Sequence, residues 1–240
     1  MLQQIIAFIT DPQNNFVGET LATLKLSIVP ILIAILVAIP LGISLAQRPL
    51  AAFIATNTSG LARAIPTLAL LAAVVPYLGI GFKPAVFALT LLGIPPILLN
   101  TITGLHSIDP ATVEAARGMG MTRWQILTRV QVPLMAPVLA AGVRTSAVQI
   151  VATVPLAGAV IGAGGYGDYI IAGVNLLQTV PLLVGGIGTA VLAFVTEILL
   201  AQGQRALTPA GLRVTAVGDQ AAGGAVSEPS ETAGSAPLAA

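Results

Sequence analysis

Long uncharged stretches alternate with short polar ones along most of this chain. Five of them are long enough to cross a bilayer, since a helix needs roughly 20 apolar residues to span the ~30 Å hydrocarbon core. They lie at residues 25–48, 63–83, 83–106, 144–168 (with a start as early as Pro133) and 168–202. Residues 50–62 contain Asn57-Thr58-Ser59-Gly60 and are either a loop or the polar start of a long second helix. The pattern predicts an all-α integral membrane protein with about five transmembrane helices.

The composition supports a membrane protein and narrows the possible chemistry. The chain is 56% hydrophobic and 8% charged, with a mean hydropathy of +0.95, whereas soluble domains carry about 25% charged residues. A net charge of +1 gives no general attraction to nucleic acid. Cysteine is absent and His106 is the single histidine, so thiolate and histidine metal clusters are excluded. We expect no cofactor and no metal, and we find no set of residues typical of an active site.

The basic residues predict which way the spans run, because cytoplasmic segments carry an excess of Lys and Arg. If the amino end lies outside, eight basic residues fall inside and only Lys25 and Lys83 fall outside. The eight are Arg48, Arg63, Arg117, Arg123, Arg129, Arg144, Arg205 and Arg213. We therefore predict an extracytoplasmic segment at 1–20, a transmembrane domain at 21–207 that includes a cytoplasmic polar loop at 109–133, and a disordered cytoplasmic tail at 208–240.

The polar loop, residues 109–133, interrupts the apolar runs with charged side chains. Among them are Glu114, Arg117, Arg123 and Arg129. Such a segment cannot lie in hydrocarbon, so it must fold against one face of the membrane. Asp109-Pro110 predicts the start of a short helix, because Asp can cap free amides and Pro suits the first helical position.

A glycine turn and a second short helix follow in the polar loop. Gly118 and Gly120 end the first helix. Thr122 and Gln125 form a T-x-x-Q capping box that starts the second, and Pro133 ends or kinks it. From these residues alone, an amphipathic surface loop and a docking element for another protein are equally good interpretations.

The spacing within the polar loop resembles a signature of bacterial ABC-importer permeases. Glu114-Ala115-Ala116 is followed after three residues by Gly120, and after nine more by Val130-Gln131-Val132-Pro133. The two valines replace the commoner Ile or Leu. The resemblance implies the type I (MetI-like) importer permease fold, in a multi-pass subunit of the bacterial plasma membrane. In that family the element docks into a cytoplasmic ABC ATPase, which implies coupling roles here for Glu114, Ala115, Ala116, Gly120, Trp124 and Pro133.

Four further strings resemble the osmoprotectant branch of this family. They are residues 64–71, 92–101, 115–121 and 161–167. The resemblance implies import of glycine betaine, carnitine, choline or proline betaine, delivered by an extracytoplasmic substrate-binding protein. It also implies pairing with a second permease copy or a homologous permease. The chain has no G-x-x-x-x-G-K-[ST] motif, so we expect a transport subunit rather than an enzyme, with ATP hydrolysed by a separate subunit.

Aromatic residues are the expected partners of a quaternary ammonium group. Tyr77, Tyr166 and Tyr169 are predicted near the outer mouth and are candidates for the substrate path. The alternative is ordinary anchoring at the membrane interface. Because these residues are few, we expect selection to reside mainly in the binding protein.

Three alternatives to osmoprotectant import remain. The first is an importer permease for another small solute, such as an amino acid or an oxyanion. The second is an ion-coupled secondary transporter, which the nearly uncharged span centres disfavour. The third is a membrane scaffold without transport, which the ordered signature of the polar loop disfavours.

Some remaining features have simpler interpretations. Gly162, Gly164 and Gly167 match a dinucleotide-binding pattern but follow a membrane span, so we interpret them as external turns. Gly158 and Gly162 allow close helix approach, either within the subunit or in a dimer. Glu197, near the end of the last span, is interpreted as a solvated carboxylate at the interface.

Overall fold

The computed structural model describes residues 1–62 and 65–207, and the elements of that part are all helical. In chain order they are α1 Leu2–Thr10, the 3-10 turn η1 Pro12–Asn14, α2 Phe16–Ala46, α3 Pro49–Ala62, α4 Thr67–Leu78, α5 Phe82–His106, α6 Pro110–Gly118, α7 Arg123–Ile126, the π-helical turn η2 Leu127–Gln131, α8 Val132–Ile161, α9 Tyr166–Asn175 and α10 Thr179–Leu207. The expected all-α fold is confirmed. The predicted tail at 208–240 lies outside the described residues.

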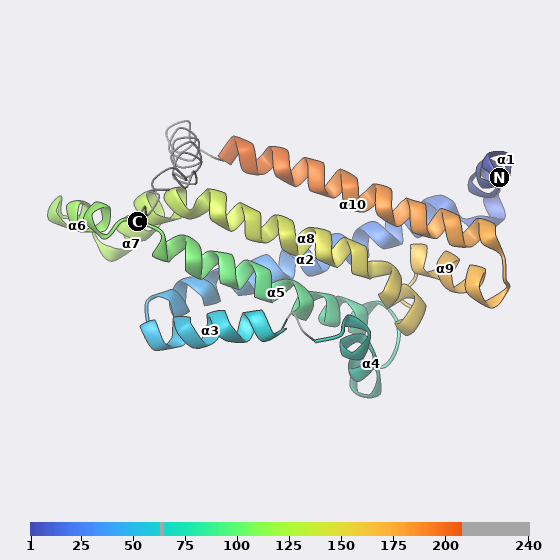
Figure 1. Ribbon diagram of the computed structural model, residues 1–240, viewed down its shortest axis with the longest axis horizontal. Helices are drawn as coiled ribbons and strands as arrows, with labels where there is room; N and C mark the ends of the chain where they lie inside the picture. Colours follow the sequence, from blue (N-terminus) through green and yellow to red (C-terminus); the bar gives the residue numbers. More distant parts are fainter. Residues whose placement is uncertain (63–64, 208–240) are drawn as a thin grey trace, which may run out of the picture.

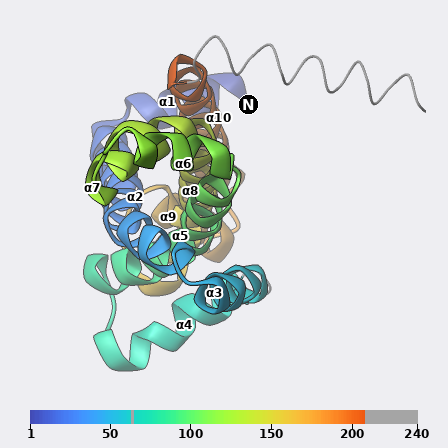
Figure 2. The ribbon, with the colours of Figure 1, turned by 90° about the vertical axis from the view of Figure 1, so that its left-hand side faces the viewer.

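The four long helices α2, α5, α8 and α10 run along one bundle (Figure 1). Each belongs to a stretch long and apolar enough to cross a membrane: Pro12–Ala46, Phe82–His106, Arg123–Ile161 and Thr179–Ala206. Helices α6 and α7 form one end of the bundle, called here the loop end, while α9 and the amino terminus lie at the opposite end, called the far end. Figure 2 looks onto the loop end and shows α6 and α7 in front of α8.

The second expected span differs from the prediction. Instead of one long helix across residues 63–83, the structure has α4 with only 12 residues. Pro66 precedes α4, and Gly79 ends it at a φ of +77°. Residues 50–62 belong to helix α3, so the loop interpretation of that segment is wrong. Its polar Asn57 bonds to the Phe53 carbonyl one turn earlier, which satisfies it within the helix.

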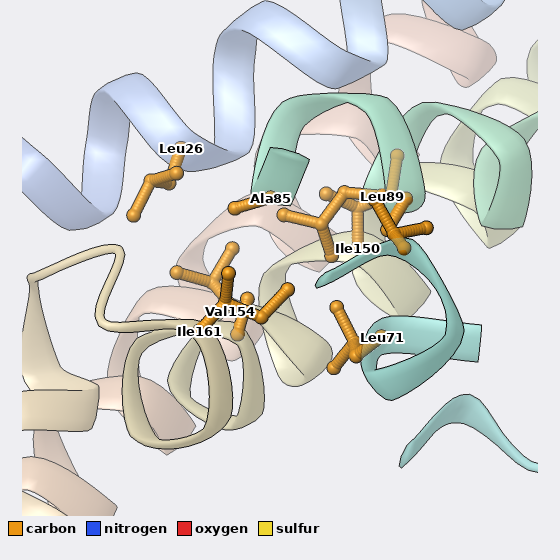
Figure 3. Packing of buried hydrophobic residues seen from close by; sticks show 10 residues of the cluster. Leu26, Leu71, Ala85, Leu89, Ile150, Val154 and Ile161 are labelled. Atoms are coloured by element: carbon orange, nitrogen blue, oxygen red, sulfur yellow. The ribbon is translucent and has the colours of Figure 1, made fainter. Parts of the chain in front are cut away.

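The bundle core is apolar and draws side chains from four helices (Figure 3). Leu26 of α2, Leu71 of α4, Leu89 of α5 and Ile150 of α8 are each at most 1% exposed. Leu71 shows that the short α4 contributes to this core although it is too short to count as a span. The predicted boundary at residue 20 falls inside α2, which begins at Phe16.

Small residues let α5 and α8 approach closely, as helices in membranes often require. A Cβ atom added at Gly93 would lie 2.7 Å from Ile150 Cδ1 and 2.8 Å from Ser146 Oγ. The Ser146 hydroxyl donates a hydrogen bond to the Gly93 carbonyl at 2.9 Å. Helix α8 is therefore held firmly against α5, which matters because α8 is also the helix that continues from the polar loop.

Candidate functional site

The first helix of the polar loop forms as the sequence predicts. Asp109 Oδ1 accepts a hydrogen bond from the Ala111 amide at 2.9 Å, and Pro110 occupies the first turn of α6. The helix ends at Gly118, and the Gly120 amide donates to the Arg117 carbonyl at 3.0 Å. Gly120 has a φ of +80°, which a residue with a Cβ adopts only at a cost.

The second helix of the loop starts with the predicted capping box. Thr122 Oγ1 accepts from the Gln125 amide at 3.3 Å, and Gln125 Oε1 accepts from the Thr122 amide at 2.8 Å. Two of the free amides at the start of α7 are therefore satisfied reciprocally. The capping fixes the direction in which the chain leaves the glycine turn.

Pro133 does not end this second helix, so that part of the prediction is wrong. The chain passes from α7 through the π turn η2 into α8, where Pro133 occupies the first turn. The Val132 amide donates to the Leu127 carbonyl, five residues earlier. In an α-helix, a proline ring would meet the carbonyl four residues earlier, and a π turn is wider. The continuous helical run Arg123–Ile161 therefore joins the loop directly to the bundle core.

The loop exposes large apolar side chains beside charged ones. Met119 is 75% exposed and Trp124 is 71% exposed. Sequence reasoning singled out Trp124 but missed Met119, whose only signal was an apolar residue inside a glycine turn. Exposed apolar groups with polar surroundings are typical of contact surfaces for another protein.

The two alanines of the signature differ in environment. Ala115 is exposed, as is Glu114 beside it, whereas Ala116 is only 2% exposed. The Ala116 carbonyl accepts from the Met121 amide at 3.3 Å, so this residue helps to close the turn. Of the two alanines, only Ala115 is therefore open to contact by another protein.

The charges on the loop are mostly positive and face outward. Arg117, Arg123 and Arg129 are all exposed, against two exposed acids, Asp109 and Glu114. Within the described residues, none of these five side chains forms an ion pair. The loop thus presents three unpaired guanidinium groups that an acidic surface on another protein would complement.

The three candidate tyrosines do not gather at one place. Tyr77 on α4 is 87% exposed, whereas Tyr166 and Tyr169 at the far end are 5% and 8% exposed. The rings of Tyr166 and Tyr169 lie 6.4 Å apart and pack with Phe16 and Phe8. Burial, with a smaller effect of Glu19, raises the pKa of Tyr169 to about 12. The buried pair stabilises the join between α9 and the first helices.

The predicted glycine turn connects α8 and α9 at the far end. Gly162, Gly164 and Gly165 have φ values between +64° and +84°. The turn is fastened to α2, because Glu19 Oε2 accepts from the Gly165 amide at 2.7 Å. Gly158 packs within the subunit, since a Cβ there would lie 2.6 Å from the Gly164 carbonyl oxygen.

An ion pair that the sequence did not reveal joins α8 to α10. Arg144 was expected in a cytoplasmic segment and Glu197 was expected to be solvated. The structure instead places each inside a long helix, with Arg144 Nε donating to Glu197 Oε1 at 2.7 Å. The two residues lie 53 positions apart, so no local pattern could have paired them.

A bundle of span-length apolar helices, with a folded polar loop continuous with one core helix, defines a multi-pass membrane protein. The chain belongs to the binding-protein-dependent transport system inner membrane component family, whose model matches residues 38–208. It is accordingly a multi-pass subunit of the inner membrane.

The chain is similar over nearly its whole length to permeases of known transport systems. It is 37% identical to the carnitine transport permease protein OpuCB of Listeria monocytogenes, covering 88% of this chain and 97% of that protein. It is 34% identical, with the same coverage, to the glycine betaine/carnitine/choline transport system permease protein OpuCB of Bacillus subtilis (strain 168). Among solved structures, an inward-facing MetNI methionine ABC transporter matches with a TM-score of 0.73 at 22% identity, covering 83% of this chain and 100% of that one. The last likeness confirms the type I importer fold.

Proposed function

We propose that this chain is a pore subunit of an ATP-driven ABC importer that takes up quaternary ammonium osmoprotectants: glycine betaine, carnitine, choline or proline betaine. The observation that carries the proposal is the identity of 34–37% to permeases whose names state carnitine, glycine betaine or choline transport. A pathway with few charges agrees with such cargo, because a net-neutral betaine needs no fixed counter-charge.

In this proposal the loop end lies in the cytoplasm and docks onto a separate ABC ATPase. Trp124 and Met119 are the apolar anchors, and Glu114 and Ala115 lie on the exposed face of α6. Gly120 sets the turn that holds the two short helices. Because α7 continues through η2 into α8, movement of the docked loop is transmitted to the bundle core without a flexible joint.

The remaining partners follow from the same assembly. A second copy of the chain, or a homologous permease, completes the pathway, because one small bundle makes a poor solute path. A substrate-binding protein delivers solute at the far end, opposite the docked loop. ATP-driven closure of the ATPases opens the pathway toward the binding protein, and hydrolysis resets it.

The experiment is transport by the complete system in proteoliposomes, with labelled glycine betaine challenged in turn by choline, carnitine, methionine and sulfate. We expect ATP-dependent uptake that choline or carnitine reduces and that sulfate leaves unchanged. Stimulation of ATP hydrolysis only by a methionine- or sulfate-loaded binding protein would refute the osmoprotectant cargo. Uptake without ATP, driven by an ion gradient, would refute the importer itself.

A further inference from the structure

A polar network ties α10 to α8 within the membrane-length part of the bundle. Arg144 donates from Nε and Nη2 to Glu197 Oε1, and from Nη1 to Gln204 Oε1 at 3.3 Å. Gln204 Nε2 in turn donates to the Pro137 carbonyl at 3.2 Å. These four residues are called the α8–α10 clamp.

The clamp lies toward the loop end of both helices. At 1.5 Å per residue, Arg144 is about 25 Å from the outer end of α8 at Ile161, and Glu197 is about 27 Å from the start of α10 at Thr179. The pair is therefore near the inner edge of a ~30 Å hydrocarbon core. Charges at this depth are retained only when paired or functional, and each side chain here is only about one-third exposed.

Helix α10 packs against few of the other described helices. Its main packing partners are α8, α9 and α1. Of these, α9 and α1 lie at the far end (Figure 1). Toward the loop end, α8 is the main helix that packs against α10. The clamp links these two helices by hydrogen bonds and an ion pair.

We propose that the α8–α10 clamp makes α10 move with α8 as one body when the docked loop is displaced, so that transport stays in step with ATP hydrolysis. The inference rests on the proposed function, because it needs the loop to be driven by an ATPase. Arg144, Glu197 and Gln204 are positioning residues for this motion. Arg144 is required as arginine, since three of its nitrogens are used and a lysine has only one.

The sharpest test replaces the clamp by a covalent tie. The natural chain has no cysteine, so R144C/E197C carries the sole reactive pair and can be bridged by a short bifunctional maleimide. The measured quantity is solute transported per ATP hydrolysed by the complete transporter in proteoliposomes. We expect the unbridged variant to lose at least fivefold in this ratio and the bridged one to regain most of it. If bridging stops transport, the helices must separate during the cycle and the proposal is wrong.

Point variants separate coupling from folding. E197Q keeps the shape of the side chain and removes its charge, whereas R144K keeps the charge and removes the planar guanidinium group. Both variants should lower the amount of solute transported per ATP hydrolysed, while ATP hydrolysis continues. The exchange R144E/E197R should restore at least half of it. The matched control is T145V, next to Arg144, whose hydroxyl bonds only to its own helix at Ala141. An unchanged ratio in E197Q, or an equal loss in T145V, contradicts the proposal.

The milder Q204L removes one arm of the clamp and keeps the ion pair, in case E197Q fails to insert. We expect it to lower the ratio by about twofold, and no change contradicts the proposal. The ratio is measured with whichever solute the unmodified transporter carries. A wrong cargo therefore shows as absent glycine betaine uptake by the unmodified protein, separately from the behaviour of the clamp.

Discussion

Replacing Gly120 with alanine changes the turn between α6 and α7 without creating a clash. A Cβ atom at this position meets nothing within 4 Å, so the whole effect comes from the φ of +80°. Holding a residue with a Cβ in the left-handed region costs about 1–2 kcal/mol. This lowers the population of the native turn relative to its alternatives by about 5- to 30-fold. The loss is local, because α8 is held independently by its packing on α5.

Gly118 supplies the matched control for this substitution. It also has open space around a Cβ, but it lies in the last position of α6 without a positive φ. Alanine there should be neutral or stabilising by about 0.5–1 kcal/mol. Asparagine at position 120 should recover part of the loss, because it tolerates the left-handed region better than alanine does.

The assay is amide hydrogen exchange across residues 119–126 of the permease in lipid nanodiscs, followed by its affinity for the ATPase. We expect faster exchange and weaker ATPase binding in G120A, unchanged values in G118A, and intermediate ones in G120N. Equal behaviour of G120A and G118A would refute the idea that the backbone of this turn determines the loop. Loss of the whole protein in G120A would equally contradict a local effect.

Three further predictions concern other parts of the molecule. W124A should weaken ATPase binding by about 30-fold, as expected for the loss of an aromatic anchor that docking buries and that contributes about 2 kcal/mol. The stability of the subunit should change little, because Trp124 is exposed in the subunit alone. Pull-down titration measures the change in affinity. Single cysteines at Thr122 and Leu177 should be labelled from opposite sides, Thr122 from the cytoplasm; labelling of both from one side of intact cells would overturn the topology. G158A should destabilise the subunit by about 1–3 kcal/mol, because its Cβ would meet backbone atoms of Gly164 and Gly167, whereas G186A in open space should not; thermal unfolding in detergent compares them.

Local signals in the sequence predicted the polar loop well because its structure is made by neighbours. Asp109 caps an amide two residues on, and Thr122 and Gln125 cap each other three residues apart. Such contacts join residues two or three positions apart, and only a few residue types form them, so the sequence itself indicates them. The four span-length helices lie in the long apolar stretches from which spans were predicted.

The sequence did not predict the features that depend on packing between residues far apart in the chain. The division of the second expected span depends on how α3 and α4 pack on α5, although Pro66 and Gly79 marked the ends of α4. Burial of Ala116 but not Ala115 depends on the fold of the loop around α6. The Arg144–Glu197 pair depends on the register of α8 against α10, which a composition nearly free of charge does not reveal.

The spacing of the loop signature acquires a physical reason from these contacts. Gly120 stands where the chain must take a positive φ to reverse between two short helices. Pro133 has no amide hydrogen to donate, yet it lies in the continuous helical run from α7 to α8, and the wider π turn at Leu127–Gln131 accommodates it. A rigid connection therefore needs Gly120 to fix the turn and needs the helix to continue past Pro133. Insertion or deletion of a residue between Trp124 and Pro133 should therefore rotate α7 relative to α8 by about 100° per residue, which moves Trp124 off the face it now occupies.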